Sequence, residues 1–120
     1  MVLVDTSVWV SHLREGNAKL EALLNEGMVV CHPFIIGELA CGTMRNRAQI
    51  LSLLQSLPTA EIAEHSEVLL FIERNRLVGK GLGYVDVHLL ASAVLTDISL
   101  WTLDRKLQQA SARIRIDYKR

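Results

Sequence analysis

The chain has 120 residues, half of them apolar and 22% charged, which is the composition of one folded domain and excludes a disordered chain. Lysine plus arginine and aspartate plus glutamate number 13 each, so no net charge attracts a polyanion and any nucleic-acid contact must be local. No stretch reaches the roughly 20 apolar residues of a spanning helix, and Asp5 interrupts the first apolar run, so we expect a cytoplasmic protein without a secretory signal.

Apolar residues alternate along the chain between short runs, typical of buried strands, and helical spacing. In the first half, the pattern predicts strands over residues 1–4 and 28–31 and helices over residues 6–13, 18–26, 34–42 and 48–57. Gly27 and Pro58 end two of these helices, and Pro33 suits the first turn of another. In the second half, the pattern predicts strands over residues 59–63, 98–103 and 112–118 and helices over residues 64–77, 85–95 and 105–110.

Strands that alternate with helices predict a parallel sheet, because each parallel crossover needs a connection long enough to hold a helix. The expected fold is one three-layer α/β/α domain over residues 1–120, with a central parallel sheet of four or five strands. No internal repeat or linker divides the chain. In such sheets ligands bind beyond the carboxyl ends of the strands, so the chemistry is expected at that edge.

Four acidic residues lie where an apolar element meets this edge. Asp5 and Asp104 each directly follow a predicted strand. Asp86 begins an apolar helix after a glycine-rich loop, and Glu38 is the one charge within residues 34–42. Each of the four has a structural explanation when taken singly. Asp5 and Asp104 lie at strand-to-helix boundaries, where an Asp caps the helix and stabilises it by about 1 kcal/mol. Asp86 lies in a first helical turn, where the helix macrodipole favours an acid, and Glu38 can occupy the exposed side of a mostly buried helix.

Together the four acids predict a cation site. Two carboxylates 4 Å apart repel each other by about 4 kcal/mol at an effective dielectric constant of 20. Converging carboxylates therefore need protons, basic side chains or cations, and only Asp104 has a basic neighbour in the sequence, Arg105. Oxygen ligands without His or Cys suit Mg²⁺ or Mn²⁺. Acidic sites of this kind serve phosphoryl transfer, in which the metal activates water and neutralises phosphate charge.

Four segments in this order resemble the signature segments of PIN-domain ribonucleases, and most of all those of VapC-type toxins from bacterial toxin–antitoxin pairs. They are residues 4–9 (VDTSVW), 35–39 (IIGEL), 85–93 (VDVHLLASA) and 100–107 (LWTLDRKL), and they keep all four acidic positions. The resemblance spans nearly the whole chain. It implies a PIN-like fold and an endoribonuclease, dependent on Mg²⁺ or Mn²⁺, that hydrolyses RNA phosphodiester bonds with metal-activated water and leaves a 5′-phosphate and a 3′-hydroxyl.

The same resemblance implies roles for individual residues. The catalytic acids that would hold the metal are Asp5, Glu38, Asp86 and Asp104. Asp5 and Asp86 would be the closest ligands, and the other two would act directly, through water or at a second ion. Ser7 and Thr102 match hydroxyl positions beside the acids and would orient a carboxylate or a water. The implied partner is a VapB-type antitoxin, whose C-terminal segment would wrap the toxin and block the acidic site.

Other residues of the sequence suggest contacts with RNA and with a second copy. Arg74, Arg76 and Lys80 would form a basic rim that holds an RNA backbone, or else the solvated end of a helix. The nearby loop over residues 79–83 (GKGLG) lacks the spacing of a phosphate-binding P-loop. The apolar residues of the first two helices and of residues 50–57 suit a homodimer face and equally an ordinary core.

Two other functions compete with the ribonuclease. In a catalytically silent α/β interaction module, the acids would serve only as helix caps. An Asp after the first strand is also the nucleophile position of haloacid-dehalogenase-like (HAD-like) phosphatases. That class needs a second Asp two residues later, where this chain has Ser7, and a downstream catalytic lysine, for which neither Lys80 nor Lys106 has a suitable context.

Overall fold

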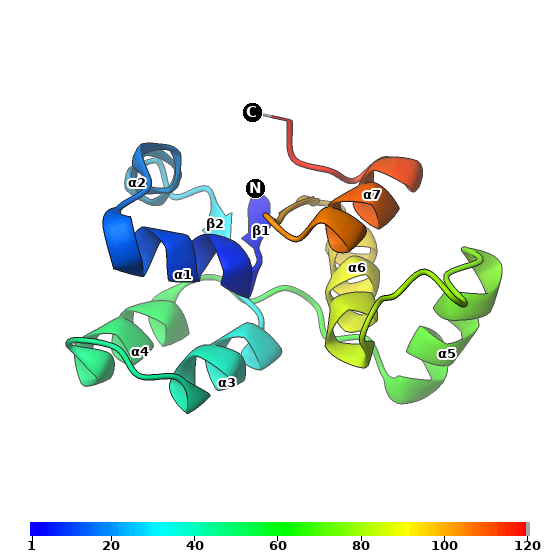
Figure 1. The fold of residues 1–120 in the computed structure, drawn as a ribbon, viewed down its shortest axis with the longest axis horizontal. Coiled ribbons are helices and arrows are strands. Elements are labelled where there is room, and N and C mark those ends of the chain that lie inside the picture. The colour runs from blue at the N-terminus through cyan, green and yellow to red at the C-terminus, as the bar shows by residue number, and fades with distance from the viewer. Residues whose placement is uncertain (120) are drawn as a thin grey trace.

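The computed structural model describes residues 1–119, in which seven helices surround a small parallel sheet (Figure 1). The elements in chain order are β1 (Val2–Val4), α1 (Thr6–Glu15), α2 (Ala18–Asn25), β2 (Val29–Val30), α3 (Pro33–Cys41), α4 (Arg47–Ser56), α5 (His65–Arg74), α6 (Tyr84–Thr96), β3 (Ser99–Trp101) and α7 (Arg105–Arg113). None of these helices, all within the described part of the chain, has the length and apolar character that crossing a membrane requires.

Strand β1 is the centre of the sheet, whose order is β2-β1-β3 with both pairings parallel. Its residues are at most 3% exposed, and the register places Leu3 beside Val30 and Leu100. Figure 1 shows α1 to α4 on one side of β1 and α5 to α7 on the other. A strand covered in this way forms an uninterrupted apolar run in the sequence. The predicted α/β fold, with helices on both sides of a parallel sheet, is confirmed.

The sheet has three strands within residues 1–119, whereas four or five were predicted. The run over residues 59–63 contributes a single parallel bridge, between Cys31 and Thr59, at the β2 edge. The ladder stops there because the next N–H groups are used elsewhere: Glu61 N–H donates to the Thr96 hydroxyl oxygen at 2.9 Å. The expected strand is therefore reduced to one bridge.

The last predicted strand, over residues 112–118, is also a single bridge, between Leu100 and Asp117. Helix α7 continues to Arg113, three residues beyond its predicted end at residue 110. Arg115 then has a φ of +63°, a left-handed conformation that turns the chain and is incompatible with an extended strand. The alternating apolar pattern at this end therefore reflects packing on the core rather than strand pairing.

The carboxyl ends of β1 and β3 meet at one edge. The backbone N–H of Asp5 donates to the carbonyl of Trp101 at 2.9 Å, which joins the two strands at the point where each ends. Helix α6 packs against β3 and runs back along the sheet, so its first turn, with Asp86, begins at this edge. Helix α1 packs against α3, which carries Glu38. The topology therefore places Asp5 and the first turn of α6, with Asp86, at the edge where ligands bind in such sheets.

Candidate active site

Asp5 occupies the N-cap position of α1 but does not cap it. Its side chain accepts no hydrogen bond from the N–H groups of that helix. Instead, the hydroxyls of Ser7 and Thr102 both donate to Oδ2 of Asp5, each at 2.7 Å. The Asp5 side chain is only 7% exposed, and its Oδ1 accepts no hydrogen bond from residues 1–119. The capping explanation therefore fails for Asp5, and one carboxylate oxygen of this buried residue remains available to a cation.

The two hydroxyls that hold Asp5 are themselves held by the backbone. The N–H of Leu103 donates to Ser7 Oγ at 2.9 Å, and the N–H of Asp104 donates to Thr102 Oγ1 at 3.0 Å. Each hydroxyl thus accepts from the backbone and directs its one proton to Asp5. The chain between β3 and α7 is in this way tied to the start of α1, with the hydroxyls of Ser7 and Thr102 between the backbone and the Asp5 carboxylate.

Asp86 lies in the first turn of α6, where its Oδ2 accepts the N–H of Gly83 at 3.0 Å. Burial raises the pKa of the Asp86 carboxyl, the hydrogen bond from Gly83 lowers it in part, and the charges of Asp5 and Asp104 raise it further. The charges of Asp5 and Asp104 therefore both act on Asp86 by repulsion. A bound cation would relieve that repulsion.

Asp104 caps α7, as the structural explanation predicted. Its Oδ1 accepts the N–H of Leu107 at 3.0 Å, and the side chain is exposed. A cap uses one carboxylate oxygen. The role of Asp104 as a cap is therefore compatible with a second role toward a cation or a water.

Glu38 lies on the outer side of the site. It is exposed, as expected for the polar side of a mostly buried helix, and its Oε1 accepts the hydroxyl of Thr6 at 2.7 Å. Its charge is not among the causes that shift the pKa of Asp86. A cavity of about 430 Å³ begins beside Thr6 and Glu38, and its walls include Val10, Leu39 and Arg45. Glu38 therefore joins the acidic cluster to an apolar groove between α1 and α3.

The four carboxylates supply oxygen donors, the ligand type that a hard cation such as Mg²⁺ prefers. Within residues 1–119, no lysine or arginine pairs with any of the four carboxylates. No three His, Cys, Asp or Glu side chains of that range are close enough together to hold one ion. Mg²⁺ keeps several of its waters and takes one or two carboxylates directly, so the donor chemistry fits it.

Two of the three basic residues predicted to touch RNA line separate cavities. Lys80 lines a cavity together with Lys106 and Arg113 of α7. Arg74 lines a different cavity, between α5 and α6, and Arg76 lines neither. The sequence alone does not group Lys106 and Arg113 with Lys80. The one feature of the sequence that places Lys106 near the acidic residues is its position two residues after Asp104.

His32 is a structural residue near the site. It is fully buried, its Nδ1 accepts the N–H of Phe34 at 3.0 Å, and its Nε2 lies 3.1 Å from the hydroxyl of Ser92. Burial, with a smaller effect of His88, lowers the pKa of His32 to about 4. The ring is therefore neutral at physiological pH and caps α3.

Comparison with known proteins agrees with this geometry. The sequence profile of the PIN domain matches residues 2–112. The chain is 46% identical, over 113 residues, to Ribonuclease VapC32 of Mycobacterium tuberculosis in both strain CDC 1551 / Oshkosh and strain H37Rv, covering 93% of this chain and 91% of that protein. PAE2754 from Pyrobaculum aerophilum shares the fold, with a TM-score of 0.59, 17% identity, and coverage of 96% of this chain and 88% of that one. The chain therefore belongs to the PIN-domain family, among its VapC-type ribonucleases.

Proposed function

We propose that the chain is a Mg²⁺- or Mn²⁺-dependent endoribonuclease and the toxin of a type II toxin–antitoxin pair. The observation that carries the proposal is Asp5, a buried carboxylate that is oriented by two hydroxyls and caps no helix. Its charge acts on Asp86, and it has no basic partner among residues 1–119. The relative's name, Ribonuclease VapC32, supports the same activity. A module with acids only as caps would not explain Asp5.

Asp5 and Asp86 are the residues we propose as closest to the cation, with Asp104 and Glu38 at its outer side. A divalent cation lowers the pKa of water and neutralises charge on the phosphate. Ser7 and Thr102 keep Asp5 in one orientation through Oδ2, which leaves Oδ1 directed away from its hydrogen bonds. Because this carboxylate does not have to reorganise, it is already arranged for the reaction before RNA binds.

The proposed reaction is hydrolysis of a phosphodiester bond. The oxygen of water attacks phosphorus, the bond from phosphorus to the 3′-oxygen breaks, and the proton of water ends on the leaving 3′-oxygen. The products are a 5′-phosphate and a 3′-hydroxyl. The test is cleavage of total cellular RNA by the purified chain, free of any antitoxin, in Mn²⁺ and in EDTA; discrete cuts with these end groups that need the metal are expected, and metal-independent or absent cleavage would contradict the proposal.

Mg²⁺ or Mn²⁺ is expected to raise the melting temperature of the metal-free protein. A cation bound only by the folded chain stabilises it by about 1.4 kcal/mol at ten times its Kd, which corresponds to roughly 3–6 °C for a domain of this size. Thermal unfolding in EDTA and in rising metal measures the shift. Asp5→Asn should lose it, whereas Glu26→Gln, at the exposed end of α2, should keep it. An equal shift in Asp5→Asn would place the cation elsewhere.

The partner we propose is a VapB-type antitoxin that covers the acidic cluster. The groove between α1 and α3 begins at Thr6 and Glu38 and has both apolar and basic walls, including Leu13, Met44 and Arg14. Such a groove suits a segment with apolar anchors and an acidic residue. A basic residue of the same segment would face the carboxylates, which have no basic partner within residues 1–119.

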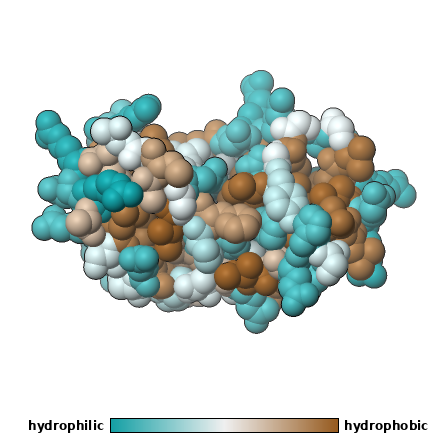
Figure 2. Space-filling view, turned by 90° about the horizontal axis from the view of Figure 1, so that it is seen from below, coloured by the Kyte–Doolittle hydropathy of each residue, from teal (hydrophilic) through white to brown (hydrophobic). Residues whose placement is uncertain are grey.

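We also propose a homodimer, formed through α5 and α6. In the first two helices Trp9 and Leu20 belong to the core, at 1% and 0% exposure, whereas Leu53, in the run over residues 50–57, is 43% exposed. Four exposed apolar residues lie on α5 and α6: Leu69, Leu70, Val94 and Leu95. Figure 2 shows this apolar surface at the right-hand end of the molecule, where α5 lies in Figure 1.

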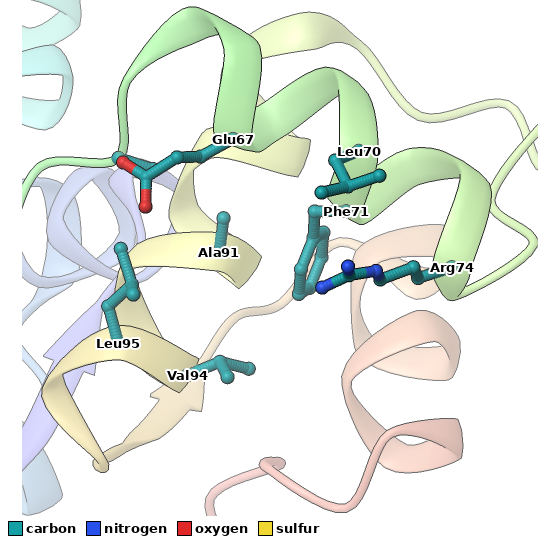
Figure 3. A pocket seen from close by; sticks show the side chains of 8 residues that line it. Glu67, Leu70, Phe71, Arg74, Ala91, Val94 and Leu95 are labelled. Carbon is teal, nitrogen blue, oxygen red and sulfur yellow. The ribbon is translucent and has the colours of Figure 1, made fainter.

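The charges of this face complement a second copy of the same face. A cavity of about 190 Å³ lies between α5 and α6 (Figure 3). Glu67 and Arg74 stand at its two ends, with Leu70 and Phe71 between them on the same helix (Figure 3). If α5 crosses its twofold copy in antiparallel orientation, Glu67 of each copy meets Arg74 of the other. One apolar centre with two equivalent ion pairs fits a second copy of this chain.

Charge reversal at this face is expected to change the oligomeric state. Glu67→Arg alone and Arg74→Glu alone each place like charges together twice per dimer and should weaken dimerisation at least tenfold. The double variant restores opposite charges and should recover the dimer. Sedimentation equilibrium measures the Kd, and Glu21→Arg on exposed α2 is the control. A dimer in both single variants, or a monomer in the double variant, would contradict this pairing.

A further inference from the structure

We infer that a basic pocket beside the acidic site binds a phosphate of the RNA backbone next to the scissile one; the inference rests on the proposed ribonuclease function. The pocket has a volume of about 180 Å³ and lies between α7 and the loop that follows α5. Its lining residues are Leu77, Lys80, Lys106, Gln109, Ala110 and Arg113. No acidic side chain of residues 1–119 is among them.

The positive charges of this pocket lack counter-charges. Three of its six lining residues are cationic, and the ammonium groups of Lys80 and Lys106 make no hydrogen bond or ion pair with residues 1–119. Like charges held together repel one another. An anion bound between them removes that repulsion, whereas a purely structural role would be expected to supply an acidic partner.

Gly81 explains how two lysines from distant parts of the chain come to line one pocket. Its φ is +75°, which favours glycine, and a Cβ at this position would lie 2.8 Å from Cδ and Nζ of Lys106. The backbone of the loop therefore lies directly on the Lys106 side chain. This contact keeps Lys106 next to the segment that carries Lys80, one residue earlier.

Arg113 provides a third cation of the pocket, held in place by hydrogen bonds. Its Nη2 donates to the carbonyls of Asn75 and of Arg76, the latter at 3.1 Å, so the guanidinium is held at the end of α5. The pocket floor is apolar, with Leu77 4% exposed and Ala110 7% exposed. A planar guanidinium with further N–H donors, together with two ammonium groups, matches the oxygens of a phosphate.

The pocket is connected to the acidic site by both of its walls. Lys106 lies two residues after Asp104 on α7, and the loop runs from Lys80 to Asp86 in six residues. An RNA strand whose scissile phosphate faces Asp86 and Asp104 would therefore pass an adjacent phosphate over Lys106. Phosphate contacts fix the position of a strand without reading its bases, so the pocket would set where the strand lies rather than which sequence is cut.

The test measures binding of a single-stranded RNA oligonucleotide by fluorescence anisotropy, with Asp86→Asn present in every protein to prevent cleavage. Adding Lys80→Ala or Lys106→Ala is expected to weaken binding roughly tenfold. Each should also reduce the slope of log K against log salt by about 0.7, the value for one lost phosphate contact on a single strand. Lys19→Ala, on exposed α2 at the opposite end of the molecule in Figure 1, is the matched control and should change neither value.

A second arm separates the pocket from the ribonuclease function, using inorganic pyrophosphate and isothermal titration calorimetry. If the chain cleaves RNA but the Lys80 and Lys106 variants bind it as tightly as the Lys19 control, the pocket assignment is overturned and the ribonuclease stands. If the chain instead neither cleaves nor binds RNA, the ribonuclease function fails. If that chain binds pyrophosphate and Lys106→Ala weakens this binding tenfold, the result still supports a phosphate-binding pocket. Pyrophosphate binding that is absent, or unchanged in Lys106→Ala, in such a chain overturns both.

Discussion

Asp5→Asn is expected to lower the rate of RNA cleavage about a hundredfold or more and to leave the fold intact. The amide oxygen can still accept the hydroxyls of Ser7 and Thr102, and the substitution changes little volume. The other oxygen, which accepts no hydrogen bond from residues 1–119, becomes an NH₂ group that cannot hold a cation. Loss of a residue that only supports a metal ligand already costs 10–100-fold, so loss of the ligand itself should cost at least as much.

The measurement is the initial rate on a mapped RNA site in Mn²⁺, together with circular dichroism and the melting temperature. Asp97→Asn is a matched control, because Asp97 is exposed at the other end of α6 and has a φ of +58°, a conformation that Asn adopts as readily as Asp. It should keep full activity. Cleavage retained in a folded Asp5→Asn protein would remove Asp5 from the metal site.

The fold class could be predicted because a strand buried on both faces is apolar whatever it pairs with. The three strands of the sheet all fall inside predicted runs. The runs over residues 59–63 and 112–118 look similar in composition, yet each forms one bridge. Whether a run extends depends on which backbone and side-chain partners the tertiary structure offers, such as the Thr96 hydroxyl that accepts the N–H of Glu61. These partners are distant in the sequence, so the local pattern of residues does not predict them.

The location of the acids could be predicted for a topological reason, but the behaviour of each could not. Asp5 and Asp104 both follow a strand and precede a helix, and only Asp104 caps its helix. The difference comes from Thr102, which lies 97 residues from Asp5 in the sequence and donates to it. A local pattern supports a cap at both positions. Only the tertiary contact between the ends of β1 and β3 distinguishes Asp104, which caps its helix, from Asp5, which is oriented by two hydroxyls instead.

Thr102→Val is expected to be the second most damaging change. Thr102 is 3% exposed, donates to Asp5 Oδ2 and accepts the N–H of Asp104. Valine fills nearly the same space but leaves both partners short of a hydrogen bond, which should lower the free energy of unfolding by about 1–3 kcal/mol. Loss of the group that orients Asp5 should also slow cleavage 10–100-fold. Chemical denaturation and cleavage rates measure the two effects.

Thr96→Val is the matched control for that loss. The Thr96 hydroxyl also donates to a carbonyl, that of Ser92, and accepts a backbone N–H, but it lies at the far end of α6 from Asp86. This variant should lose comparable stability and keep its cleavage rate, whereas equal losses of activity in both variants would show that stability alone controls the rate. Thr102→Ser, which retains the hydroxyl, should recover most of the activity.

A double-mutant cycle decides whether Thr102 acts through Asp5. If the hydroxyl serves only to orient that carboxylate, Thr102→Val should slow cleavage 10–100-fold in the native chain and hardly at all once Asp5 is Asn, because the group that it orients no longer acts. The stability changes should stay closer to additive, since the N–H of Asp104 loses its partner in either background. Additive effects on the rate would instead assign Thr102 a role of its own, toward a water or the RNA.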